Sequence, residues 1–256
     1  MRFVGHTIRR RLLHAWKALG RHGVHSPLVY QLIDRDLKKP LPRELKDIER
    51  YRSSLLSSKQ TWQPQDLGAG SRMKIRTLGE AVKSATSGKN KGAFLYRWST
   101  RFQPQNILEL GTHVGISAAY LLAGNREALL TTIEGDPYLH QQAQNYLQSV
   151  SSNAITIQGN FDDILPEVLP SKKWDLVVID GNHRGEALKK YFAEILPHLN
   201  ENAWVLMDDI HWSPDMTAAW ETLVDQCGNK LTLDFYQWGA YCHTPRNQKE
   251  HFLLRY

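Results

Sequence analysis

Two glycine-rich turns, each preceded by an acidic residue, have the residue types needed to wrap a nucleotide. They read DLGAGSR at residues 66–72 and ELGTHVG at residues 109–115. A cofactor loop of this kind needs a strand to aim it and a helix that begins beyond it. The apolar run NILEL leads into the second turn, whereas TWQPQ, which cannot form a buried strand, precedes the first. The second turn is therefore the predicted cofactor loop.

Within this loop the residue types suit close contact with a ligand. Gly111 and Gly115 allow tight approach of the backbone, and Ser117 opens the stretch SAAYLLAG as its predicted N-cap. Glu134 ends the next apolar run, in TIEGDP. A carboxylate at that strand tip accepts the hydroxyls of a ribose in dinucleotide-binding folds. The loop and the acidic strand tip together predict a site for a nucleoside-containing cofactor.

Three further carboxylates follow two later apolar runs, in VVIDGNHR and VLMDDIHW. Asp180, Asp208 and Asp209 come just past the ends of runs that should form neighbouring parallel strands. Ligands bind at the carboxyl edge of a parallel sheet, where converging carboxylates would repel one another without a cation. All-oxygen ligation suits Mg²⁺ or a similar hard divalent ion. The alternative is a loop-orienting role for Asp180 with no metal present.

These side chains need a parallel sheet to bring them to one edge, and the pattern after Pro104 predicts one. Short runs rich in Ile, Val and Leu alternate with helical stretches, which is typical of a doubly wound α/β sheet. The runs are NILEL, LLTTIE, AITIQG, WDLVVID and AWVLMDD. Two later segments, KLTLDFYQWGAYCHT and EHFLLRY, have no helix between them and are expected to pair antiparallel at one sheet edge.

Upstream of the sheet the chain is expected to be helical. Residues 40–65 predict one helix flanked by loops. RTLGEAVKSA and KGAFLYRWSTRF predict two more helices, separated by the turn TSGKNK. The expected organisation is a helical extension over residues 1–77 and a cofactor-binding domain over residues 78–256.

The motif series ELGTHVGIS, TIEGDP, GNFDD, VVIDGNHR and VLMDDIHW resembles that of the class I S-adenosylmethionine-dependent methyltransferases. More narrowly, it is similar to the catechol-type, metal-assisted O-methyltransferases over residues 78–256. The resemblance implies a Rossmann-like, seven-stranded sheet whose last strand is antiparallel, and S-adenosylmethionine as the cofactor. Phe161 or Asp162 would lie beside the adenine, with helix capping as a compatible role for Asp162 and Asp163. The implied cofactor contacts are Glu109, Gly111, Gly115, Ser117, Glu134, Phe161, Asp162 and Asp180.

The same resemblance places the metal on Asp180, Asp208 and Asp209. The ion would bind a substrate hydroxyl, lower its pKa and hold the oxyanion in line with the methyl group. Catechol-type enzymes usually have asparagine where this chain has Asp209, and a lysine base where it has His183. Because histidine can deprotonate a hydroxyl near neutral pH, His183 and Asp180 are the expected catalytic residues. In the alternative without metal, Asp180 contacts the methionine portion of the cofactor.

The two residues that end the last of these motifs are candidates for the acceptor pocket. His211 and Trp212 follow Asp209 and would line that pocket, with ordinary packing as the alternative for Trp212. The earlier turn, DLGAGSR, is a candidate lid. Gly68 and Gly70 would let it change shape, and nearby basic side chains could meet an anion. The alternative is a plain surface turn that joins two helices.

Basic residues gather at the beginning of the chain, where residues 1–33 contain no acid. Val4, Ile8, Leu12 and Trp16 recur at every fourth position beside arginines, which predicts an amphipathic helix with a basic face. Residues 1–20 could then make peripheral contact with an anionic membrane, or could contact nucleic acid. The favoured interpretation is that the apolar stripe packs on the protein and the arginines are solvated.

Composition places the chain among globular proteins, since 256 residues with 41% hydrophobic content can bury a full core. No apolar run approaches the roughly eighteen residues that span a bilayer, and no secretory signal pattern is present. Cys227 and Cys242 fit neither a CxxC pair nor a metal-ligand spacing. A cytoplasmic protein is therefore expected.

Three functions compete on this evidence. The leading hypothesis is a methyltransferase that acts on a hydroxyl of a small molecule. A nucleic-acid or ribosome-associated methyltransferase is the runner-up, and it is disfavoured because base-modifying enzymes commonly carry an NPPY-like tetrapeptide where this chain reads DGNH. The third hypothesis is a non-catalytic module that binds the cofactor or associates with a membrane.

Overall fold

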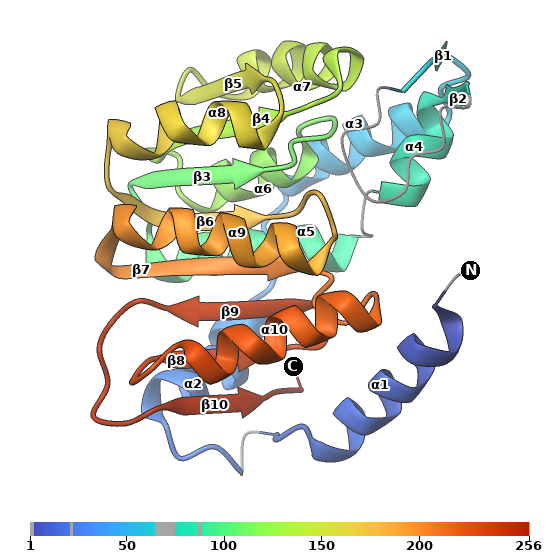
Figure 1. Ribbon diagram of the computed structural model, residues 1–256. Coiled ribbons are helices and arrows are strands. Elements are labelled where there is room, and N and C mark those ends of the chain that lie inside the picture. Colours follow the sequence, from blue (N-terminus) through green and yellow to red (C-terminus); the bar gives the residue numbers. More distant parts are fainter. Residues whose placement is uncertain (1–2, 21–22, 65–74, 86–88, 256) are drawn as a thin grey trace. The chain divides into compact units, whose positions relative to one another are not determined.

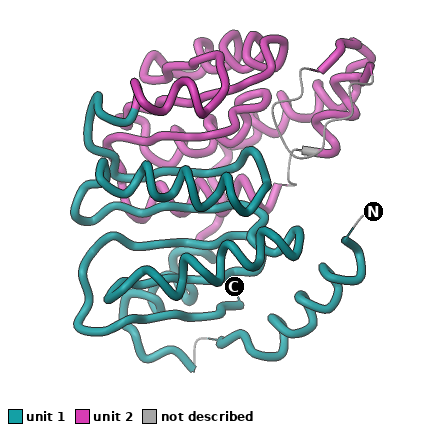
Figure 2. Tube along the Cα trace, in the orientation of Figure 1, with its two compact units in different colours: residues 1–38, 169–256 teal, residues 39–168 magenta. Residues whose placement is uncertain are grey.

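The computed structural model describes residues 3–20, 23–64, 75–85 and 89–255. The chain divides into two compact units, coloured separately in Figure 2. Unit 1 comprises Met1–Lys38 and Leu169–Tyr256, and unit 2 comprises Lys39–Val168. The predicted boundary between residues 77 and 78 therefore falls inside unit 2. The predicted lid, residues 66–72, lies outside the described residues.

Helices α3, α4 and α5 precede the parallel strands of unit 2, as predicted (Figure 1). Helix α3 packs against α4 and α6, which explains why residues 39–77 belong to this unit rather than to a separate extension. The short strands β1 and β2 pair antiparallel. The elements of this part are α3 (Leu45–Leu56), β1 (Thr61–Trp62), β2 (Arg76–Thr77), α4 (Leu78–Ala85) and α5 (Lys89–Phe102).

Three parallel strands follow, in the order β3-β4-β5. The apolar runs of β3 and β4 are buried on both faces, as parallel strands covered by helices require, whereas β5 is partly exposed. Ile107, Leu130 and Ile133, for example, are fully buried. The strands and the helices after them are β3 (Asn106–Leu110), α6 (Ile116–Gly124), β4 (Leu129–Glu134), α7 (Pro137–Val150), β5 (Ala154–Gln158) and α8 (Phe161–Val168).

Unit 1 contains the remaining strands, of which β6 and β7 are parallel. Trp174, Trp220 and Trp238 fill its core. Its first part holds α1 (Val4–Lys17), α2 (Pro27–Asp34) and the 3₁₀ helix η2 (Asp36–Lys38). Its second part holds η3 (Leu169–Ser171), β6 (Trp174–Ile179), α9 (Gly185–Ile195), η4 (Leu196–His198), β7 (Leu199–Asp208), α10 (Pro214–Gln226), β8 (Leu231–Asp234), β9 (Trp238–Cys242) and β10 (Glu250–Leu253).

The last strands differ from the prediction. KLTLDFYQWGAYCHT forms a hairpin by itself, because the chain reverses between β8 and β9 at Tyr236, whose φ is 72°. Strand β9 lies antiparallel between β7 and β8, while β10 pairs parallel with β8. The α/β, Rossmann-like class with antiparallel strands near the end is confirmed. Apart from β1 and β2, the described residues form three strands in unit 2 and five in unit 1, eight in all, where the resemblance implied seven.

Helix α1 forms as predicted, but its packing is the reverse of the favoured interpretation. Val4, Ile8, Leu12 and Trp16 are 49%, 55%, 67% and 79% exposed, whereas His14 is buried. The apolar stripe therefore does not pack on the protein. Within the described residues, no helix is both long and apolar enough to cross a membrane.

Candidate cofactor and acceptor sites

The predicted cofactor loop connects β3 to α6 in unit 2. Gly111 has φ = 105° and Gly115 has φ = 84°, in the left-handed region that favours glycine. A Cβ atom at Gly115 would also come within 3.2 Å of the Leu147 side chain. The backbone N–H groups of Gly111 and Thr112 both donate to the Ile133 carbonyl, at 3.0 and 3.2 Å. Strand β4 therefore holds the beginning of the loop in place.

The N-cap of the helix after this loop lies two residues earlier than predicted. The cap is Gly115, which makes no side-chain capping hydrogen bond, and Ile116 is the first residue of the helix. Ser117 is thus already helical and is not the cap. A glycine at the cap leaves the first N–H groups of α6 without a side-chain acceptor, which suits an anionic or polar ligand at this helix end. The contact of Ser117 with a cofactor remains a prediction.

Glu134 ends β4, as predicted, and its carboxylate braces the loop. Oε2 accepts a hydrogen bond from the His113 N–H at 2.7 Å, and Oε1 accepts one from the Asp136 N–H at 2.9 Å. The Gly135 backbone also donates to this carboxylate, which has about four lone-pair sites, so it can still accept a further hydrogen bond. A ribose hydroxyl fits this remaining capacity. Burial raises the pKa of Glu134 to about 7.

Two residues that support this site were missed in the sequence. His113 has φ = 51°, and burial, with the charge of Arg76, lowers its pKa to about 4. Asp136 caps α7 by accepting the N–H groups of Tyr138 and Leu139, and its Oδ2 accepts Trp62 Nε1 at 3.1 Å. The dipeptide Asp-Pro at a helix start is an N-terminal signal that could have revealed Asp136. No sequence pattern indicates that the His113 backbone N–H donates to Glu134.

Glu109 lies inside the sheet, fully buried in β3. It stands opposite Thr132 of β4, whose hydroxyl donates to Oε2 at 2.6 Å. Burial raises the pKa of Glu109 to about 7. The pair ties the two strands together directly below the loop. Contact of Glu109 with the cofactor remains a prediction.

The GNFDD motif begins α8 at Phe161, so Asp162 and Asp163 lie in the first helical turn. The capping role belongs to Asn160 instead, because its Oδ1 accepts the Asp162 N–H at 3.3 Å. Gly159, just before it, donates its N–H to the Glu134 carbonyl at 3.0 Å. This hydrogen bond joins the motif to the end of β4. Adenine contacts by Phe161 and Asp162 remain predictions.

In unit 1 the structure places the predicted carboxylates at strand ends but does not form a metal site from them. Asp180 follows β6 and Asp208 ends β7, and the register of these parallel strands pairs Ile179 with Met207. Asp208 is only 2% exposed, because β9 lies along the other side of β7. Across the described parts of the chain, no group of three or more His, Cys, Asp or Glu side chains could hold a metal ion. The set Asp180, Asp208 and Asp209 is thus not such a group.

The structure does bring the two predicted catalytic residues together. His183 Nε2 lies 3.8 Å from Asp180 Oδ1, and both side chains are partly exposed. The preceding residue, Asn182, has φ = 50° and donates to the Tyr191 hydroxyl at 3.0 Å, which anchors the turn on α9. This turn carries the histidine back toward Asp180.

The two candidates for the acceptor pocket are separated by their environments. Trp212 is 41% exposed, and its ring lies 6.2 Å from the ring of His183, so it is not a core residue. His211 is buried, with Nε2 2.8 Å from Asp234 Oδ2 and Nδ1 3.2 Å from the Thr217 hydroxyl. The side chain of His211 therefore belongs to a buried polar network, while Trp212 accompanies the predicted catalytic pair.

Comparison with known proteins finds a matching family model and curated relatives. A family model described as a methyltransferase domain matches residues 108–210. O-methyltransferase hkm8 of Aspergillus hancockii is 28% identical over 137 residues, which cover 50% of this chain and 53% of that protein. The chain spans about half the length of the curated relatives it matches.

Solved structures agree with the fold. The methyltransferase PaMTH1 of Podospora anserina, solved with SAH, has a TM-score of 0.55 at 17% identity, covering 82% of this chain and 99% of that one. The O-methyltransferase of Bacillus cereus in complex with SAH has a TM-score of 0.55 at 15% identity, covering 84% and 94%. Residues 108–210 thus match a methyltransferase domain, and the fold of the chain resembles that of solved methyltransferases.

Proposed function

We propose that the chain transfers a methyl group from S-adenosylmethionine to a hydroxyl of a small molecule. One observation carries the proposal: the glycine loop is braced by Glu134, whose carboxylate can still accept a hydrogen bond from a hydroxyl. The match of residues 108–210 to a methyltransferase domain supports it. The acceptor class is suggested by the name of the relative hkm8, an O-methyltransferase.

Residues of unit 2 would hold the cofactor. The backbone of Gly111 to Gly115 and the uncapped start of α6 would face its polar groups, and Glu134 would accept from the ribose. Phe161 and Asp162 are proposed to lie beside the adenine, with Glu109 and Ser117 completing the set. When bound, the cofactor supplies an electrophilic methyl group on a sulfonium centre.

Residues of unit 1 would prepare the acceptor. His183 is the proposed general base, because its imidazole is partly exposed and lies beside a carboxylate. With Nε2 toward Asp180, the proton of the acceptor hydroxyl would move to Nδ1, and the negative charge of Asp180 would stabilise the imidazolium. The exposed ring of Trp212 offers an apolar surface next to that base, which suits an aromatic or otherwise apolar acceptor.

Metal assistance, which the resemblance implied, is not part of this proposal. Asp180, Asp208 and Asp209 form no metal-binding group in the described structure, so we assign the proton transfer to His183 alone. A nucleic-acid acceptor is disfavoured, because nothing about His183 and Asp180 favours a nucleobase over a small hydroxylated molecule as the methyl acceptor.

A methyl-transfer screen with labelled S-adenosylmethionine over hydroxylated small molecules tests the function. We expect label in at least one product, both with Mg²⁺ and after chelation, and a fall in turnover of about 10²-fold or more in His183→Ala. Cofactor affinity, measured separately by calorimetry, should stay within about twofold in that variant. Strict dependence on a divalent ion would overturn the metal-free assignment. Cofactor binding without transfer to any acceptor would favour the non-catalytic module instead.

A further inference from the structure

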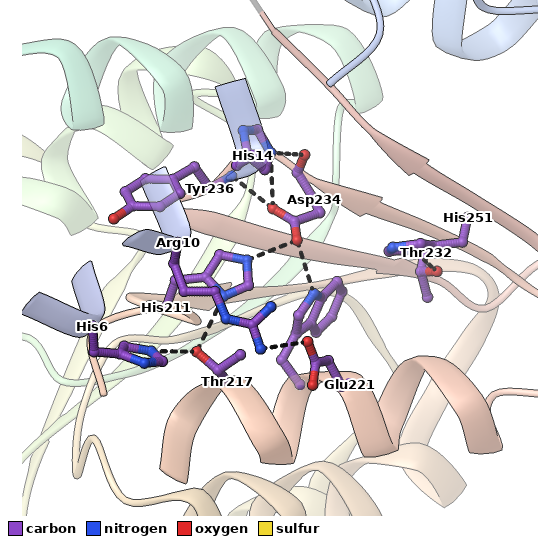
Figure 3. A network of polar contacts seen from close by, with 11 residues as sticks. His6, Arg10, His14, His211, Thr217, Glu221, Thr232, Asp234, Tyr236 and His251 are labelled. Carbon is purple, nitrogen blue, oxygen red and sulfur yellow. Dashed lines mark hydrogen bonds and ion pairs between the residues drawn. The ribbon is translucent and has the colours of Figure 1, made fainter. Parts of the chain in front are cut away.

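Helix α1 contacts the rest of unit 1 through its polar face (Figure 3). The partners come from α10 and from the β8-β9 hairpin, far away in the sequence. Four contacts define this attachment. They are His14 Nε2 to Asp234 Oδ1 at 3.2 Å, His6 Nε2 to Thr217 Oγ1 at 3.1 Å, Arg10 to Glu221 at 2.7 Å, and the Tyr236 hydroxyl to the Thr7 carbonyl at 2.8 Å.

The centre of this attachment is the buried carboxylate of Asp234. Besides His14 it accepts His211 Nε2 at 2.8 Å, Trp220 Nε1 at 3.3 Å and the Tyr236 N–H at 2.8 Å. A carboxylate held by this many donors cannot turn to a new partner without leaving buried groups unsatisfied. The rotation of α1 about its own axis is therefore set by polar contacts, not by its apolar side chains.

The consequence is that the apolar stripe of α1 points outward. The stripe consists of Val4, Ile8, Leu12 and Trp16, which are between 49% and 79% exposed. Arg11 lies three residues after Ile8, and Arg9 lies seven residues before Trp16, so the two arginines border the stripe on opposite sides. No acidic residue occurs in α1.

We infer that this outward face of α1 docks on an anionic lipid surface. Apolar side chains in the centre of a helix face, with basic side chains along its borders, are the arrangement of helices that lie in a membrane interface. The arginine stems can follow the apolar surface while their charged groups reach lipid phosphates. Trp16 lies at one end of the stripe, and tryptophan is enriched at the headgroup level of membranes.

Charge argues against the two other occupants of this face. In a symmetric pair of chains the same face meets itself, which would bring Arg9 and Arg11 near their own copies without an acidic partner from α1. Nucleic acid would be bound by the charges, but its binding leaves four large apolar side chains without burial. A lipid surface uses both features of the face.

The test is flotation or sedimentation of the full chain with vesicles of pure phosphatidylcholine, and with vesicles of equal parts phosphatidylcholine and phosphatidylglycerol. We expect binding to the anionic vesicles and at least about tenfold weaker partition in Ile8→Ser. Ile155→Ser is the matched control, because Ile155 of β5 is 54% exposed against 55% for Ile8. The double variant Arg9→Gln/Arg11→Gln should lose about tenfold on anionic vesicles only, and the exposed Arg126→Gln should lose little.

The outcomes separate the three occupants. The inference is overturned if the wild-type chain does not bind anionic vesicles, or if Ile8→Ser and Ile155→Ser bind equally well. A dimer by analytical ultracentrifugation that Ile8→Ser dissociates would assign the face to a second copy. Binding to RNA that depends on Arg9 and Arg11 but not on Ile8 would assign it to nucleic acid. The vesicle experiment does not measure methyl transfer. A failure to bind vesicles would therefore leave the proposed function unaffected.

Discussion

At the scale of single residues, the candidate site depends on buried carboxylates whose ionisation is difficult. Burial raises the pKa values of both Glu109 and Glu134 to about 7. Both accept hydrogen bonds that favour the charged form, from Thr132 and from the backbone respectively, yet the loss of water outweighs them. Their charge is therefore sensitive to pH near neutrality, where the carboxyl groups of exposed residues are fully ionised.

Replacement of Glu134 tests its role toward the cofactor. Glu134→Ala removes the proposed acceptor for the ribose, and a charged hydrogen bond contributes roughly 1.5–3 kcal/mol, so affinity should fall about ten- to a hundredfold. Calorimetric titration with S-adenosylmethionine gives the ratio, with the exposed Glu127→Ala as the control. Since Glu134 also braces His113 and Asp136, thermal unfolding must first establish that the variant is folded. Unchanged affinity in a folded variant would remove Glu134 from the site.

Glu109 offers a test through stability. Its pKa lies near 7 in the folded chain against about 4.5 in the unfolded chain, so between these values the folded state binds more protons. The free energy of unfolding contributed by this residue is greatest at low pH and falls as pH rises through that window. Urea unfolding from about pH 5 to 7 should show a slope up to about 1.4 kcal/mol per pH unit steeper in the wild type than in Glu109→Gln. Equal slopes would contradict the burial argument.

At the scale of elements, the attachment of α1 contains a histidine that titrates. Burial alone would lower the pKa of His14, but the hydrogen bond and charge of Asp234 outweigh it and raise the pKa above its ordinary value. The same contacts, with those of His211, hold the pKa of Asp234 well below its usual range. The stabilising ion pair is complete below the ordinary histidine pKa of 6.5 and is lost as pH rises through the raised value.

We therefore expect α1 to be held more weakly at alkaline pH. Hydrogen exchange of the amides of residues 4–17, corrected for the intrinsic rate, should be about three- to tenfold faster near pH 8 than near pH 6. In His14→Gln, which keeps a hydrogen-bond donor without a titrating charge, this dependence should disappear. The charged and titratable groups that face His14 are Asp234, His211, Tyr236 and Arg255. A pH dependence that persists in the variant would assign the effect to one of the others.

At the scale of the whole molecule, the residues predicted to bind the cofactor and those predicted to act on the acceptor belong to different compact units. The cofactor motifs lie in unit 2, on the helices and loops that follow β3, β4 and β5. The predicted catalytic pair and α1 lie in unit 1. Residues 1–38 and residues 169–256 belong to the same unit although they are distant in sequence, which no pattern within either segment indicates. The predicted division at residue 77 followed patterns along the chain, which cannot reveal that residues 1–38 and 169–256 form one unit.

Local features of the site were determined by the sequence alone. NILEL and LLTTIE become β3 and β4 with the predicted bounds, and a strand, a glycine turn and a helix in succession placed Gly111, Gly115 and Glu134 correctly. Such features depend on near neighbours, because strand period, backbone freedom at glycine and helix capping act over a few residues.

Only the tertiary structure decided the features that depend on distant partners. Periodicity identified the apolar stripe of α1, but Asp234, which lies 220 residues beyond His14, set which face of the helix is buried. In the same way, only the tertiary structure shows that β10 pairs parallel with β8 and that β9 lies beside the end of β7, where Asp208 is buried. Side-chain patterns indicate what each segment can bury or bind. Which of these contacts form depends on the other segments that are available to pack against it in the folded chain.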